Sequence, residues 1–154
     1  MNSDRKNPQP LKLSIDYKSM VERFYDEAKL LGLVAPIEPY QFCWKVNDLL
    51  HFDFRTRHDL QIQKHNKGRN YFFPIYQYKI PQTSIGHYIY VNHDDGEYLL
   101  PELKHFDYLW LMKFDEVDED EIELFTKTIK TIPVLQMVTE LAIDKIKKKE
   151  DLFF

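Results

Sequence analysis

The pattern of hydrophobic and polar positions predicts short strands near the start of the chain. Residues 1–10 are polar and contain two prolines, which is typical of a disordered lead. Residues 11–15 alternate between apolar and polar side chains, and this alternation predicts a short strand. Apolar positions then recur at helical spacing over 19–31, while the apolar run over 30–37 is typical of a strand. We therefore expect a short helix that gives way to a strand near Leu30.

The middle of the chain predicts one helix followed by a meander of hairpins. Proline is tolerated in a first helical turn, so Glu38-Pro39 is expected to open a helix with an apolar stripe formed by Phe42, Cys43, Val46, Leu49 and Leu50. Four strand segments are expected after it, at 60–64, 71–80, 85–93 and 97–100. Asn66-Lys67-Gly68 and Asp94-Asp95-Gly96 supply residues that tolerate positive φ in turns. Pro74 cannot donate a ladder hydrogen bond, which predicts an edge position or a bulge.

The last part of the chain predicts a strand, a helix and a second strand. Residues 106–114 are apolar at nearly every position, as in a strand at the centre of a sheet. Asp118 and Glu121 form a capping-box-like pair ahead of an amphipathic helix, and Pro133 ends that helix. Residues 134–141 alternate like a strand. If the two strands are parallel, a right-handed crossover is expected between them.

This order of elements predicts the α+β class. We expect a two-layer sandwich in which two helices pack on one face of a mixed, mostly antiparallel sheet of about six strands. The expected domain covers residues 11–144, after the disordered lead 1–10. Residues 145–154 form a lysine-rich C-terminal tail that ends in the apolar segment 152–154. Burial would stabilise this segment, so it is expected to dock on the domain or on a partner.

Composition and charge narrow the function classes. Of the 154 residues, 44% are hydrophobic and 30% are charged, as in ordinary globular proteins. The single cysteine, Cys43, excludes an internal disulfide and fits a reducing compartment, so a cytoplasmic location is expected. No export signal and no apolar run of membrane-spanning length is found, so no membrane association is expected. A net charge of −4 gives no global attraction to nucleic acid.

The most distinctive segment is Leu100-Pro101-Glu102-Leu103-Lys104-His105-Phe106-Asp107-Tyr108. It resembles the signature of the IPExxxVDY family, a group of small bacterial proteins. In this chain Leu100 occupies the position of the signature isoleucine, and Phe106 occupies the position of its valine. Pro101, Glu102, Asp107 and Tyr108 match the signature. The resemblance implies no activity, cofactor or catalytic residue, because none is assigned to the family.

Two interpretations of this signature are open. Pro101 restricts Leu100 to extended geometry, so the segment can be a strand entry in which Asp107 accepts a local hydrogen bond. Alternatively, Glu102, Lys104 and Asp107 form part of a binding surface, with Tyr108 supporting the following strand. In the second case, replacing Glu102 and Lys104 together is expected to change stability by less than about 1 kcal/mol.

Catalytic and metal-binding patterns are missing from the sequence. There is no GxSxG, no glycine-rich phosphate loop and no HExxH. Cys43 is expected to be a buried structural thiol. His51 and His93 each lie close to carboxylates, at Asp53 and Asp94, but neither pair has a third ligand at recognised spacing. We therefore predict no cofactor, no metal and no catalytic residue.

One segment, residues 55–78, suggests nucleic-acid binding. Its cations are Arg55, Arg57, Lys64, Lys67 and Arg69, and five aromatic residues follow them. Cations beside aromatic strands are the combination that binds single-stranded RNA. The segment matches no known RNA-binding motif, and aromatic residues in strands are more often core.

The sequence therefore leads to three function hypotheses. The first is an interaction or assembly module without catalytic activity, which binds a protein partner or forms a homodimer. The second is weak binding of single-stranded RNA by residues 55–78. The third is a small-molecule or metal-dependent enzyme whose site would arise from side chains that converge in space.

Overall fold

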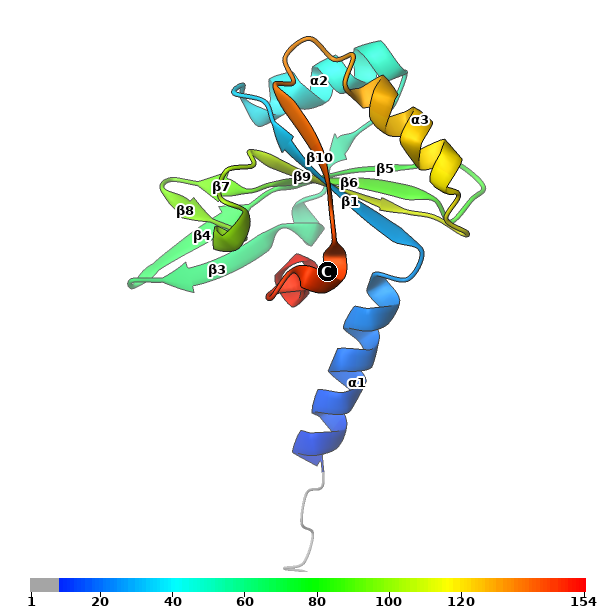
Figure 1. Ribbon diagram of the computed structural model, residues 1–154. Helices are drawn as coiled ribbons and strands as arrows, with labels where there is room; N and C mark the ends of the chain where they lie inside the picture. Colours follow the sequence, from blue (N-terminus) through cyan, green and yellow to red (C-terminus); the bar gives the residue numbers. More distant parts are fainter. Residues whose placement is uncertain (1–8) are drawn as a thin grey trace, which may run out of the picture.

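A six-stranded antiparallel sheet forms the centre of the computed structural model, which describes residues 9–154, with side chains from Asp16 onward (Figure 1). The helices are α1 (Gln9–Phe24), α2 (Pro39–Leu50) and α3 (Glu119–Ile129). The strands are β1 (Ala28–Val34), β2 (Arg55–Thr56), β3 (Ile62–Asn66), β4 (Arg69–Phe73), β5 (Ile75–Lys79), β6 (Gly86–Val91), β7 (His93–Asp94), β8 (Glu97–Tyr98), β9 (Tyr108–Lys113) and β10 (Met137–Leu141). The predicted α+β class is confirmed.

The strand order of the main sheet is β10-β1-β9-β6-β5-β2, and every neighbouring pair is antiparallel. The apolar segment predicted over 106–114 supplies β9, which lies inside the sheet between β1 and β6. Because β9 and β10 are both antiparallel to β1, they run parallel to each other with β1 between them. The two strands predicted near the end of the chain, β9 and β10, therefore lie on either side of β1, and α3 connects them.

Helices α2 and α3 cover one face of this sheet, as predicted. Phe42 and Val46 of α2 pack with Ile122 and Ile129 of α3 over Trp110, which is fully buried. The Asp118 side chain accepts hydrogen bonds from the backbone of the first turn of α3, so the predicted N-terminal cap is present. Such a cap stabilises a helix by about 1 kcal/mol.

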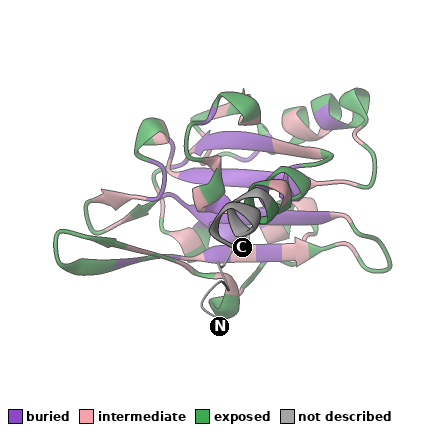
Figure 2. Cartoon of the chain, turned by 90° about the horizontal axis from the view of Figure 1, so that it is seen from below, coloured by how far each residue is buried: buried purple, intermediate pink, exposed green. Residues whose placement is uncertain are grey.

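The other face of the sheet is covered by pieces from both ends of the chain and by a hairpin. Phe24 of α1, Phe73 of β4 and Leu152 share one apolar cluster with Tyr90 and Leu111 of the sheet. Figure 2 shows that the buried residues concentrate in the central strands. The hairpin of β3 and β4 is a separate two-stranded sheet, and so is the pair of β7 and β8.

Two local predictions near the N-terminus are wrong. Residues 11–15 belong to α1, not to a strand, and the helix expected over 19–31 ends at Phe24. The strand that follows begins at Ala28, two positions before the expected start. Part of the predicted disordered lead, residues 9–10, belongs to α1, and the rest lies outside the described residues.

The turn residues behave as their chemistry predicts. Gly68 and Gly96 have φ of 73° and 85°, and Lys67 and Asp95 before them also have positive φ. Two consecutive residues with positive φ form the type of hairpin turn whose twist matches that of the strands. Pro74 separates β4 from β5, so the single strand predicted over 71–80 is divided at the residue that cannot donate a ladder bond.

Candidate functional site

The signature segment forms a loop between β8 and β9 that closes around the side chain of Asn92. The Asn92 Oδ1 accepts a hydrogen bond from the backbone N–H of Leu100 at 3.0 Å. Its Nδ2 donates to the carbonyl oxygens of Leu103 and Phe106, each at 3.0 Å. Asn92 is fully buried. The loop is therefore shaped by a residue outside the signature, which no motif in the sequence marked.

The apolar members of the signature are part of the core. Leu100 and Phe106 are buried. The ring of Phe106 lies on Gly32 of β1, where an added Cβ would come within 2.7 Å of the ring. Only glycine leaves room for Phe106 at this position. Pro101 begins the 3₁₀ turn Pro101–Leu103, and Lys104 follows it at the surface.

Glu102 binds the C-terminal segment. Its two carboxylate oxygens accept hydrogen bonds from the backbone N–H groups of Lys147 and Lys148, each at 3.2 Å. The segment then continues to Leu152, which is fully buried and whose carbonyl accepts a hydrogen bond from Tyr90 Oη at 2.8 Å. The segment 152–154 thus docks on the domain, one of the two outcomes that the sequence left open.

We expect Glu102→Ala to loosen the C-terminal segment without unfolding the domain. Two hydrogen bonds to a carboxylate are lost at the surface, which is expected to cost about 1–2 kcal/mol. Amide hydrogen exchange at Lys147 and Lys148 should speed up about tenfold. Lys104→Ala, at an exposed neighbour, is the matched control and should leave both amides unchanged. Equal exchange rates in Glu102→Ala and the parent protein would contradict this role.

Asp107 and Tyr108 join the end of the signature to the segment that leads into α2. The Asp107 Oδ2 accepts a hydrogen bond from the backbone N–H of Ala35 at 2.9 Å, and Tyr108 Oη donates to the carbonyl of Ile37. The Tyr108 ring stacks on Phe42 with ring centroids 4.5 Å apart. Burial raises the pKa of the Tyr108 hydroxyl, and the neighbouring Cys43 and Asp107 add to the shift. The phenol therefore stays protonated and keeps its donor role.

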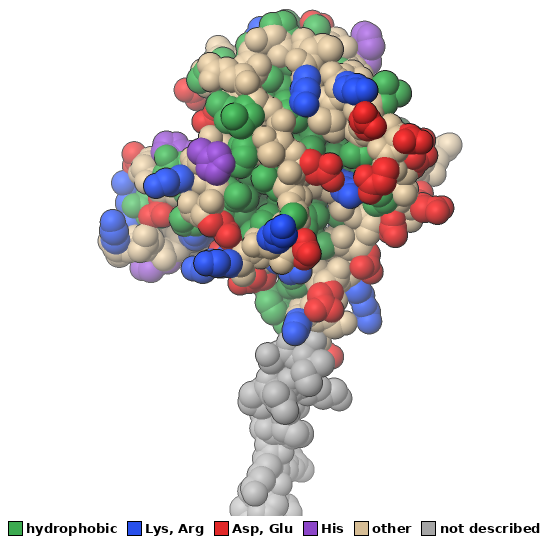
Figure 3. All heavy atoms as spheres, viewed as in Figure 1, with side chains coloured by type: hydrophobic (Ala, Val, Ile, Leu, Met, Phe, Trp, Pro, Cys, Tyr) green, Lys and Arg blue, Asp and Glu red, His purple; other side chains and the backbone are tan. Residues whose placement is uncertain are grey.

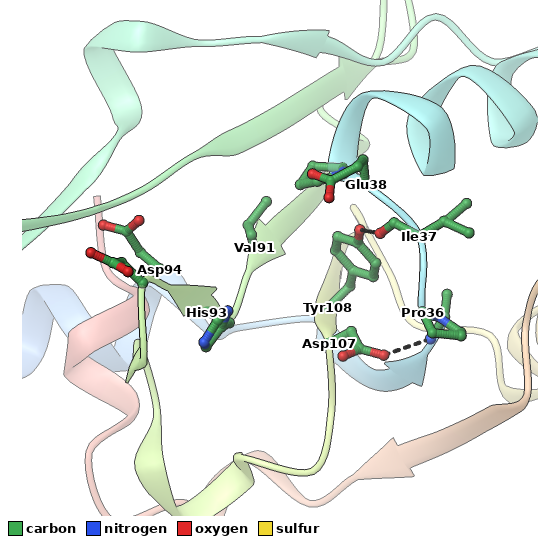
Figure 4. A pocket seen from close by; sticks show the side chains of 11 residues that line it. Pro36, Ile37, Glu38, Val91, His93, Asp94, Asp107 and Tyr108 are labelled. Carbon is green, nitrogen blue, oxygen red and sulfur yellow. Dashed lines mark hydrogen bonds between the residues drawn. The ribbon is translucent and has the colours of Figure 1, made fainter.

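These contacts frame a hollow of about 330 Å³ at the end of the sheet beside the start of α2 (Figure 4). Its lining comes from three parts of the chain: residues 35–39, residues 91 and 93–95, and residues 107–108. Four carboxylates line it, from Glu38, Asp94, Asp95 and Asp107, and no lysine or arginine is among the described residues that line it. We call this the acidic hollow.

The carboxylates of the acidic hollow differ in the hydrogen bonds and ion pairs that they form within the protein. Asp107 is held by Ala35, Asp94 accepts a hydrogen bond from the backbone N–H of Phe72 at 2.9 Å, and Asp95 pairs with Arg69. Among the residues that the structure describes, Glu38 has no ion-pair partner. Of the four carboxylates, only that of Asp95 is paired with a cation, Arg69, among the described residues. The excess negative charge of the hollow favours a cationic ligand group.

An aromatic surface lies immediately beside the acidic hollow, on the first turns of α2. Tyr40 and Trp44 are each 65% exposed, and they stand four residues apart on the same side of the helix. With Gln41 and Lys45 they line a second, shallow hollow. We call these four residues the aromatic ledge. In the sequence, the signal for this surface is a tryptophan, Trp44, next to the apolar stripe of the helix.

The cations of the predicted RNA-binding segment are mostly bound within the protein. Arg55 pairs with Asp53, Arg57 with Asp59 and Arg69 with Asp95, while Lys64 Nζ donates to the carbonyls of Tyr98 and Leu99. Lys67 lies in the turn of the β3–β4 hairpin. Among the aromatic residues that follow these cations, Tyr71 and Phe73 are buried, and Phe72 is 44% exposed. Lys64, Lys67 and Arg69 share the β3–β4 hairpin, whereas Arg55 and Arg57 lie at or next to β2.

The residues weighed for catalysis and metal binding lie apart. Cys43 is buried, and burial raises the pKa of its thiol to about 12, so the reactive thiolate is suppressed. His51 follows α2 in a left-handed conformation, and His93 Nε2 accepts a hydrogen bond from the backbone N–H of Gly96. Within the described part of the chain, no group of three or more His, Cys, Asp or Glu side chains is placed to hold a metal ion.

Comparison with models of known protein families, with curated proteins and with solved structures found no match to this chain. None of the helices in the described residues combines the length and apolar character needed to span a bilayer. The acidic hollow and the aromatic ledge are therefore the features on which a functional argument can be built.

Proposed function

We propose that the protein is a cytoplasmic interaction module without catalytic activity, and that it binds a partner through the aromatic ledge and the acidic hollow. The observation that carries this proposal is the pair of side chains Tyr40 and Trp44, both exposed and both on one side of α2. Tyrosine and tryptophan are enriched at the centres of protein interfaces, where their burial supplies most of the affinity.

The charge around the ledge supports a partner segment with a basic residue. Glu38 and Pro39 line the acidic hollow, and the next two residues of the chain, Tyr40 and Gln41, belong to the ledge, so both surfaces involve the start of α2. A lysine or arginine of the partner would enter the hollow next to Glu38. An adjacent apolar side chain would then cover Trp44. Association would be steered by the negative potential of the hollow.

A peptide-display selection on the purified full chain tests this function. We expect the selected peptides to be enriched in lysine or arginine next to an apolar residue. A synthetic peptide of that kind, titrated by tryptophan fluorescence or calorimetry, should lose at least about 30-fold in affinity with Trp44→Gln, because truncated hot spots cost about 2 kcal/mol or more. Glu38→Gln should weaken binding and reduce its salt dependence.

The matched control is Leu124→Gln on the outer side of α3, where Leu124 is 68% exposed. It removes an apolar surface side chain of the other helix and should leave peptide affinity unchanged. All three variants replace exposed residues, so thermal stability should change little. Selection of peptides without basic residues, or equal affinity of the parent protein and Trp44→Gln, would contradict the proposal.

RNA binding by residues 55–78 remains the alternative proposal, and it has less geometric support. Three of its five cations are paired with aspartates, at Asp53, Asp59 and Asp95, and two of its rings are buried. The two functions differ in their salt response. RNA binding would fade steeply as salt rises, whereas contacts to the aromatic ledge would persist. Membership of the IPExxxVDY family also stays a prediction.

A further inference from the structure

The outer edge of β10 is the longer of the two open edges of the main sheet. The strand order ends with β10 on one side and β2 on the other. β2 has two residues, whereas β10 has five, Met137–Leu141. Among the residues that the structure describes, β1 is the sole strand paired with β10, and Figure 1 shows β10 running across the front of the molecule with no element over it.

The sequence of β10 has one of the usual protections of an edge strand, the charged residue Glu140, and lacks the others. Natural edges are blunted by proline, charged side chains and above all lysine, bulges or short length, because unpaired N–H and C=O groups can pair with another strand. Met137-Val138-Thr139-Glu140-Leu141 contains no proline and no lysine, and Val138 and Thr139 favour strand geometry. Met137 is 50% exposed. Figure 3 shows apolar side chains exposed on the front of the molecule, with Lys, Asp and Glu side chains beside them.

Side chains of β10 are compatible with an identical strand running antiparallel across a two-fold axis. If the axis passes Thr139, that residue lies opposite Thr139 of the second copy, and Met137 lies opposite Leu141 of the second copy. Val138 then lies opposite Glu140 of the second copy. Threonine pairs and apolar pairs at these positions stabilise antiparallel strands. The pairing would also cover the exposed Met137.

The one charged residue of β10, Glu140, forms an ion pair within its own chain. Glu140 pairs with Lys29 Nζ at 3.3 Å, and Lys29 also pairs with Glu119 at 2.9 Å. Like charges brought together at an interface are costly. In the proposed register Glu140 lies opposite Val138 of the second copy, so the two Glu140 carboxylates do not lie opposite each other, and each keeps its ion pair with Lys29.

We propose that β10 is the assembly edge of this protein and pairs antiparallel with β10 of a second copy. The two six-stranded sheets then continue into one another across the dimer. This surface does not use the acidic hollow or the aromatic ledge, so each copy keeps its own recognition surface. The dimer would present two such surfaces to a partner, and avidity would follow from their linkage.

Light scattering coupled to gel filtration of the full chain is the first test. A mass of twice 18.7 kDa is expected for the parent protein at high concentration. Thr139→Lys places two ammonium groups opposite one another at the axis and should weaken dimerisation by at least about 100-fold. Thr139→Glu should do the same. An equimolar mixture of the two variants should recover the dimer, because opposite charges then meet.

Two controls separate loss of pairing from loss of folding. Thr56→Lys, on the exposed edge strand β2, should leave the dimer intact. Met137→Lys repeats the test at a second position of β10 if a Thr139 variant is unstable. In the parent protein, hydrogen exchange of β10 amides should slow as concentration rises, and it should not do so in Thr139→Lys. A parent protein that stays monomeric at its highest soluble concentration, or a dimer that survives Thr139→Lys, overturns the proposal.

Discussion

Replacing Asn92 by alanine is expected to lower the free energy of unfolding by about 4 kcal/mol, the largest effect of any single substitution considered. The side chain is fully buried and satisfies the N–H of Leu100 and the carbonyls of Leu103 and Phe106. Removing it leaves the N–H of Leu100 and the carbonyl of Phe106 without this partner, whereas the carbonyl of Leu103 still accepts from the N–H of Phe106. Each group left without a partner costs about 1–3 kcal/mol when water cannot reach it. Urea unfolding followed by far-ultraviolet circular dichroism measures the change.

Two further variants make this prediction specific. Asn92→Asp keeps the acceptor but turns a carboxylate oxygen toward two carbonyl oxygens, so at pH 7 it should be no more stable than the alanine variant. Asn66→Ala removes an exposed amide that donates to Glu97, and it should cost less than about 0.5 kcal/mol. A loss below about 1 kcal/mol in Asn92→Ala would mean that the loop does not depend on this side chain.

The same substitution should also damage the acidic hollow. The backbone N–H of Asn92 donates to the carbonyl of Asp107, and the loop that Asn92 closes delivers Asp107 and Tyr108 to the hollow. Peptide binding by Asn92→Ala at a temperature where it is still folded should therefore be weakened, although Asn92 itself does not line the hollow.

Elements with a strong local signal were predictable from the sequence. The α2 helix begins at Pro39 and α3 has Asp118 as its cap, because proline and aspartate satisfy requirements that arise within a single turn. The nearly all-apolar segment became β9, an inner strand of the sheet with helices over one face. The two helix starts depend on interactions within a few residues, and β9 is marked by its own apolar run.

The predicted strand over 11–15 failed because five residues of alternation are too few to define a period. The same apolar positions continue into Tyr17 and Met20 at spacings that a helix also accommodates, and α1 extends over all of them. Pro10 lies in the first turn of α1, where its missing N–H costs nothing. The prolines that suggested disorder are therefore partly compatible with the start of a helix.

The candidate site was the least predictable part, because its residues meet only through the fold. Glu102 binds the backbone of residues 45 and 46 positions away, at Lys147 and Lys148. The acidic hollow combines three segments that no motif connects. The sequence did mark Asp107 and Tyr108 as distinctive, but nothing local shows that their partners are Ala35 and Ile37.

The protein should lose about 2 kcal/mol of stability between pH 7 and pH 5 through one histidine, His87. This residue is buried in the helix-covered core, where its Nδ1 accepts a hydrogen bond from Trp110 Nε1 at 3.0 Å. The rings of Phe52 and Phe125 lie 5.2 Å from the imidazole. Burial lowers the pKa of His87 to about 4. A proton on Nδ1 would also face the indole N–H.

The sign of this pH dependence follows from the pKa of His87 in the folded and in the unfolded protein. An unfolded histidine has a pKa of about 6.5, so below that pH the unfolded chain binds a proton that the folded protein excludes. Stability is thus complete above about pH 6.5 and is lost progressively toward pH 4, where the folded state also becomes protonated. His87→Gln should flatten this dependence between pH 7 and pH 5, while His105→Gln, at an exposed residue, should retain it. Urea midpoints that fall equally in the parent protein and His87→Gln would assign the acid sensitivity to other groups and leave His87 without this role.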